Sequence, residues 1–73
     1  MEFRDALKFY NDNVEWDMHW SNMHIVIEDG NMEDDHIKWC VDQGVNEKEK
    51  KVCDFLLSIP VEARYDIWEV SSA

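Results

Sequence analysis

Three histidines and two cysteines are the side chains of this chain best suited to binding a metal or forming a nucleophile. A structural zinc site usually takes its ligands as closely spaced pairs. Cys40 and Cys53 have no C-x-x-C spacing, and His19 and His24 flank a predicted turn. We therefore expect no metal and no cofactor, with the cysteines buried as small apolar side chains.

A Cys–His pair would be the remaining route to nucleophilic catalysis. The sequence offers such a pair no Gly-rich phosphate-binding loop and no nucleophilic serine elbow. A chain of 73 residues also leaves little room for a substrate cleft. These observations predict that the protein is not an enzyme.

The stretch EDGNMEDD, residues 28–35, contains five carboxylates: Glu28, Asp29, Glu33, Asp34 and Asp35. It lacks the alternating oxygen ligands and the final Glu of an EF-hand calcium loop. One interpretation is a solvated turn followed by a helix start, where acidic side chains are favourable. The other is a set of carboxylates that occupies a basic channel meant for nucleic acid.

Charge is the most informative global property of the chain. There are 17 acidic and 7 basic side chains, and residues 1–46 contain eleven of the acids but only three of the bases. Because duplex DNA is bound largely through Lys and Arg, this balance disfavours nucleic acid as the partner. It favours a larger protein with a basic surface.

Residues 31–57 resemble a helix-turn-helix, the motif of many DNA-binding proteins. Cys40, Gly44, Val45 and Asn46 match the motif's small residue, turn glycine, apolar residue and helix cap, whereas Lys50 stands where an apolar anchor is usual. The resemblance implies an alternative in which a helix reads DNA through Lys48, Lys50 and Lys51. Neighbouring acids should repel phosphate, so direct nucleic-acid binding is the less favoured reading.

The elements that position these residues are predicted to form one small α+β domain spanning residues 1–73. Residues 2–10 have the apolar spacing of a helix, and the Asn and Asp residues at 11–13 are expected to end it. Apolar and polar residues then alternate through residues 14–20 and 23–28, which predicts a β-hairpin turning near Ser21 and Asn22. An all-helical alternative would place Trp16 and Trp20 in contact at an offset of four.

Two or three helices should follow the hairpin. The first is expected from about Met32 to Gln43, with Ile37, Cys40 and Val41 inward and Gly44 ending it. Asn46 and Glu49 have the spacing of a capping box for the second, whose inward stripe is Val52, Phe55, Leu56 and Ile59. Pro60 should open the last helix, carrying Val61, Tyr65 and Trp68, and residues 71–73 should fray.

Four tryptophans exceed what the core of so small a domain needs, and tryptophan is enriched in the hot spots of protein interfaces. In the predicted hairpin Trp16 and Trp20 pack inward beside Met18. Trp39 lies off the inward stripe of its helix and is therefore the first candidate for an exposed anchor. Trp68 is the second.

The chain shows no signal peptide, no run of apolar residues long enough for a membrane span and too few cysteines for a disulfide framework. These features predict a cytoplasmic protein, expected to be a monomer.

In size, charge and aromatic content the chain resembles the small acidic regulators that bacteriophages make to take over host machinery. That resemblance implies a protein that binds bacterial RNA polymerase and inhibits or modifies transcription, antitermination included. The residues expected to contact the partner are Glu28, Asp29, Glu33, Asp34, Asp35 and Trp39. The alternative within the binding class is a DNA mimic that inhibits a nuclease, a CRISPR complex or a restriction complex.

Overall fold

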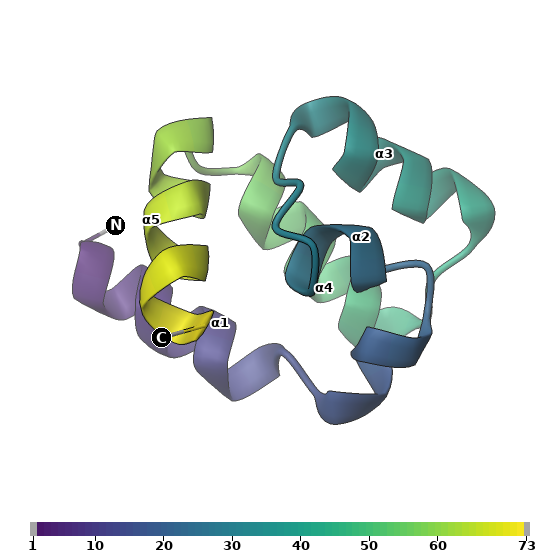
Figure 1. Ribbon diagram of the computed structural model, residues 1–73, viewed down its shortest axis with the longest axis horizontal. Helices are drawn as coiled ribbons and strands as arrows, with labels where there is room; N and C mark the ends of the chain where they lie inside the picture. The colour runs from purple at the N-terminus through teal and green to yellow at the C-terminus, as the bar shows by residue number, and fades with distance from the viewer. Residues whose placement is uncertain (1, 73) are drawn as a thin grey trace.

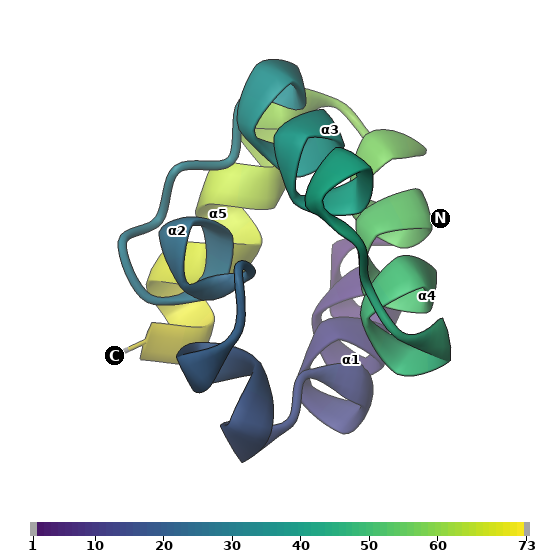
Figure 2. The same cartoon turned by 90° about the vertical axis from the view of Figure 1, so that its right-hand side faces the viewer.

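The computed structural model describes residues 2–72, and its regular elements are all helical. They are α1 (Phe3–Asn13), the 3₁₀ helix η1 (Trp16–Trp20), α2 (His24–Ile27), α3 (Asp34–Gln43), α4 (Glu47–Leu57) and α5 (Val61–Ser72). The long helices pack as two neighbouring pairs, α1 with α5 and α3 with α4, while η1 and α2 contact each other and connect the pairs (Figure 1). In Figure 2, η1 lies at the opposite end of the molecule from α3.

The expected α+β class is wrong, because residues 14–28 form η1 and α2 and no strand occurs between residues 2 and 72. The amide of Met18 donates to the carbonyl of Glu15, and the amide of Ser21 donates to that of Met18. The Ser21 hydroxyl also donates to the Met18 carbonyl at 2.9 Å. An isolated two-stranded sheet is marginal in water, whereas these local bonds form a compact turn that buries Met18 and Met23.

Two further boundaries differ from the prediction. α1 continues through Asn13, whose side-chain amide donates to the Phe9 carbonyl at 2.7 Å and so completes the helix end instead of breaking it. α3 begins at Asp34, with Glu33 rather than Asn31 as its N-cap residue. Met32, where the helix was expected to begin, precedes it and is fully buried in the core.

The link between α3 and α4 follows the sequence prediction closely. Gly44 ends α3 with a φ of 100°, a conformation that residues with a side chain rarely adopt. The Asn46 side chain accepts a hydrogen bond from the Glu49 amide at 2.8 Å, and the Glu49 carboxylate accepts one from the Asn46 amide at 3.0 Å. This reciprocal pair confirms the predicted capping box.

The core lies where the faces of all these helices meet. α4 contributes more buried apolar residues than any other helix, and Ile37, Cys40, Val52 and Leu56 are fully buried as predicted. In α5, Ile67 and Arg64 point inward, while Val61, Tyr65 and Trp68 are only half-buried. The end that was expected to fray remains helical through Ser72, and Ala73 lies outside the described residues.

Candidate partner-binding surface

Trp16 and Trp20 are the most exposed large apolar side chains in the described part of the chain, with 74% and 77% of their surfaces open to solvent. The prediction that they pack inward beside Met18 is therefore wrong. One turn of 3₁₀ helix points only Met18 into the core and turns the two indoles outward. Exposing two tryptophans sacrifices a large hydrophobic gain, so this arrangement favours an interface role.

The two indoles contact each other in a defined geometry. Their ring centres are 6.1 Å apart and their planes meet at 75°, an edge-to-face pair. The His19 ring lies beside Trp16 with a centre-to-centre distance of 5.4 Å. The aromatic side chains thus form one cluster on η1. We call Trp16, Trp20 and His19 the aromatic cluster.

One carboxylate lies beside this cluster, because Glu28 approaches Nδ1 of His19 to 3.9 Å. Asp17 is exposed and lines the pocket that also contains Lys48, and Glu15 pairs with Lys48 at 2.8 Å. The cluster therefore offers apolar surface with a carboxylate at its edge, a composition that suits a basic partner.

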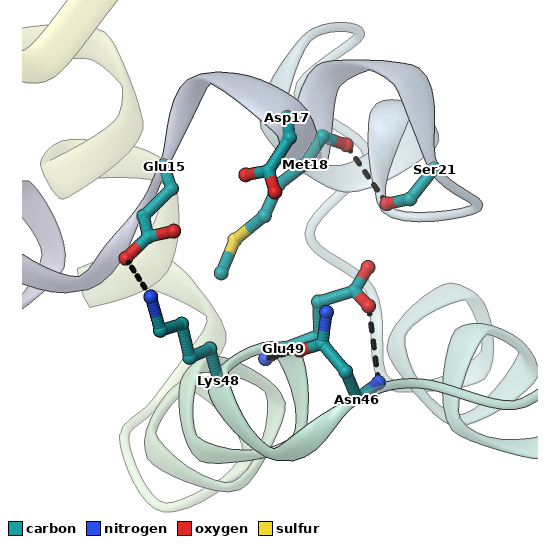
Figure 3. A pocket seen from close by; sticks show the side chains of 7 residues that line it. All are labelled: Glu15, Asp17, Met18, Ser21, Asn46, Lys48 and Glu49. Atoms are coloured by element: carbon teal, nitrogen blue, oxygen red, sulfur yellow. Dashed lines mark hydrogen bonds and ion pairs between the residues drawn. The ribbon is translucent and has the colours of Figure 1, made fainter.

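Glu15, Asp17 and Glu49 also line a pocket of about 60 Å³ between η1 and the start of α4, with Lys48 on one side (Figure 3). Glu49 is committed to the capping box, and Glu15 is committed to Lys48. A pocket of this size holds little more than water. The Glu15–Lys48 ion pair at this pocket joins the start of η1 to α4.

The predicted acidic residues do not form one patch around Trp39. Glu33, Asp34 and Asp35 border a shallow hollow together with Val61 at the start of α5. Glu28 lies instead beside His19, and Asp29 is exposed in the connection after α2. Of the predicted site residues, Glu28 is the one that approaches the aromatic cluster, through His19.

Asp34 has a structural partner. Arg64 is only 4% exposed, and its guanidinium donates to Asp34 at 2.6 Å and to the Met32 carbonyl at 2.9 Å. Its Nε donates to the Leu56 carbonyl at 2.5 Å. Arg64 thus ties the starts of α3 and α5 to the end of α4, and Asp34 balances its charge. Asp34 is a poor choice for testing partner binding, because its loss would leave a buried cation without its counter-ion.

The other two tryptophans have different environments. Trp39 on α3 is 40% exposed, in agreement with its predicted outward position, but it does not belong to the aromatic cluster on η1. Trp68 is half-buried, and its indole nitrogen donates to the Ile27 carbonyl at 2.9 Å. Trp68 therefore serves the fold, and the proposal that it is an exposed anchor fails.

The three lysines of the helix-turn-helix alternative are engaged with other side chains. Lys48 pairs with Glu15, and Lys50 pairs with Asp54 at 2.7 Å. The Lys51 ammonium lies 5.4 Å from the ring centre of Phe9. The hydrogen bond to Glu15 raises the pKa of Lys48, because it stabilises the charged ammonium. Phosphate would have to compete with carboxylates for two of these three side chains.

Both cysteines are buried, as the sequence suggested. The Cys40 thiol donates to the Asn22 carbonyl at 3.3 Å, and burial raises its pKa. Burial raises the pKa of the Cys53 thiol to about 12. Raised values suppress the thiolate that nucleophilic chemistry needs. Within residues 2–72, His, Cys, Asp and Glu side chains do not gather in groups of three or more that could hold a metal ion.

None of the helices formed by residues 3–72 has the length and hydropathy required to cross a membrane. No family model, curated protein or solved structure matches the chain.

Proposed function

We propose that this protein is a non-enzymatic regulator that binds the basic surface of a larger protein, with bacterial RNA polymerase as the target whose transcription it inhibits or modifies. The observation that carries the proposal is the exposed Trp16–Trp20 pair, which lies beside His19 and its neighbour Glu28. Tryptophans of this kind supply the desolvated centre of an interface. The surrounding carboxylates would steer the protein towards basic surfaces.

Bacterial RNA polymerase suits this chemistry because its nucleic-acid-facing channels present many basic side chains. An acidic protein of this size could occupy such a surface and act by steric and electrostatic exclusion. Glu28, Asp29, Glu33 and Asp35 are exposed and available for the encounter. Asp34 contributes to the same field while it remains paired with Arg64.

A DNA mimic that inhibits a nuclease, CRISPR or restriction complex is the second candidate. The exposed carboxylates at the start of α3 favour it. The tryptophan pair separates the candidates, because a mimic of phosphates alone has no need for two exposed indoles. The hypothesis of sequence-specific DNA binding has less support than the DNA mimic, since Lys48 and Lys50 already have carboxylate partners.

The test is direct binding of the purified protein to purified bacterial RNA polymerase core enzyme and holoenzyme, with transcription from a defined template as the functional measurement. Trp16→Ala and Trp20→Ala should each weaken binding by about 30-fold, the scale of a hot-spot loss of about 2 kcal/mol. Phe3→Ala is a matched control, because Phe3 is an exposed aromatic residue at the start of α1. Trp39→Ala tests the anchor favoured by the sequence and should have the smaller effect.

Absence of binding to either polymerase form would refute the polymerase target. Unchanged binding by Trp16→Ala and Trp20→Ala would remove the tryptophan pair from the interface. A gel shift with duplex DNA near physiological salt addresses the remaining alternative, and retention of DNA there would favour the helix-turn-helix reading. Competition with DNA for a nuclease, without polymerase binding, would favour the mimic.

A further inference from the structure

A second pocket, of about 140 Å³, adjoins the aromatic cluster. Tyr10, Val14 and Ile27 form its apolar walls, and Asn11 and Ser71 contribute polar atoms. His19 belongs to this pocket and also lies beside Trp16, so the pocket and the tryptophan pair form one continuous surface. We call this surface the η1 corner.

Two helix ends give the η1 corner negative character. The carboxyl ends of α1 and α5 meet there, joined by a 2.9 Å hydrogen bond from the Ser71 hydroxyl to Oδ1 of Asn11 (Figure 1). Helix carboxyl ends carry partial negative charge on their unpaired carbonyls. Within residues 3–13 and 61–72, neither helix has a basic side chain in its last turn to offset that charge.

A full charge adds to this field, because the Glu28 carboxylate lies 3.9 Å from Nδ1 of His19. Asp17 lines the neighbouring pocket instead, where Glu15 binds Lys48 (Figure 3). The corner thus combines aromatic faces, hydrogen-bond acceptors and the Glu28 carboxylate, and that combination fits a cation.

We propose that the η1 corner receives an arginine side chain of the protein partner, with the guanidinium stacked on Trp16 or Trp20 and its N–H groups directed at acceptors of the corner. The inference rests on the proposed function, because it names the group on the partner that the aromatic cluster recognises. Arginine fits better than lysine, because a planar guanidinium stacks on indole and distributes five donors. An apolar side chain would bury carbonyl and amide oxygens without replacing their bonds to water.

The probe is a blocked peptide with one arginine flanked by glycine and serine, compared with the same peptide carrying citrulline. Citrulline keeps the shape of arginine and lacks the charge. Indole N–H signals in ¹H–¹⁵N spectra, assigned with single Trp→Phe variants, report each tryptophan separately. The arginine peptide should shift the signals of Trp16 and Trp20, leave that of Trp39 in place, and bind at least about tenfold more tightly than the citrulline peptide.

Matched glutamate variants test the charge. Glu28→Gln should weaken binding of the arginine peptide severalfold, whereas Glu62→Gln, at the opposite end of α5, should leave it unchanged. Equal binding of the arginine and citrulline peptides, or tighter binding of a leucine peptide, would overturn the inference. A protein that gives either peptide result can still bind polymerase, so these results leave the proposed function standing. Conversely, a protein that binds the arginine peptide as expected but does not bind polymerase would refute only the proposed target.

Discussion

Trp68 illustrates at the residue scale how a tryptophan becomes part of the fold. Its indole nitrogen donates to the Ile27 carbonyl, and its ring covers Gly30, where a Cβ atom would lie 2.7 Å from Cζ2 of the indole. Gly30 also has a φ of 73°, in the left-handed region that favours glycine. Both the backbone and the packing at this point therefore require a residue without a side chain.

Gly30 and Gly44 form a matched pair for a stability prediction. Gly44→Ala introduces backbone strain alone, because no atom lies within 4 Å of the added Cβ, and should lower the free energy of unfolding by about 1 kcal/mol. Gly30→Ala adds a clash with Trp68, and we expect a loss of about 3 kcal/mol. Urea titrations of both variants measure the difference. Equal losses would show that Trp68 moves aside at little cost.

The sequence could not rank the four tryptophans by exposure. Each has the same intrinsic hydrophobicity, and its burial depends on the direction in which its element turns the side chain. For Trp39 the helix was predicted correctly, and its place off the inward-facing side of that helix predicted the exposure that is observed. For Trp16 and Trp20 the element itself was misassigned. The all-helical alternative, which placed the two indoles in contact, agrees with the observed edge-to-face pair.

At the element scale, prediction succeeded where a local chemical signal was specific. The capping box at Asn46 and the glycine after α3 depend on short-range geometry, and both occur where expected. Apolar alternation over residues 14–20 is a weaker signal, because it does not identify the neighbouring strand that would pair with the backbone of this segment. The predicted hairpin had no third strand and no turn glycine, so tertiary packing of Met18 and Met23 decided the outcome.

Asn46 provides the prediction for this scale. Asn46→Ala removes the acceptor for the Glu49 amide and should lower the free energy of unfolding by about 1 kcal/mol. Asn46→Ser is the control, because its hydroxyl can accept the same bond and should retain most of the stability. Chemical denaturation followed by circular dichroism measures both. A fully stable Asn46→Ala protein would mean that packing alone sets the start of α4.

For the molecule as a whole, two buried groups predict an alkaline limit to stability. Burial raises the pKa of Cys53 from 9.0 to about 12 and that of Tyr10 from 10.0 to about 12. The unfolded chain therefore releases these protons at lower pH than the folded chain. Their contribution to stability is complete below about pH 9 and is lost as the pH rises towards 12.

Unfolding free energies measured across this range should fall most steeply above about pH 10, where both groups contribute up to roughly 1.4 kcal/mol per pH unit each. Tyr10→Phe keeps the buried ring and removes the phenol proton, so its decline should be shallower. An unchanged slope in Tyr10→Phe would show that the hydroxyl reaches solvent in the folded protein.

The net charge of −10 predicts that salt affects folding and partner binding in opposite directions. At about 10 mM salt the screening length is about 30 Å, comparable with the longest dimension of the described part, also 30 Å. Carboxylates then repel one another across the whole molecule. At about 150 mM the screening length falls to about 8 Å, so only neighbouring charges interact. Added salt should therefore raise the unfolding free energy while it slows association with a basic partner.

Stopped-flow association and urea titration at matched salt concentrations would measure both trends on one preparation. Asp35→Asn removes an exposed charge and leaves the Asp34–Arg64 pair intact, so it should reproduce part of each effect at low salt. A rate of association that does not respond to salt would show that the carboxylates do not steer the encounter. Binding would then depend on the aromatic cluster alone, and a basic surface would no longer be required of the partner.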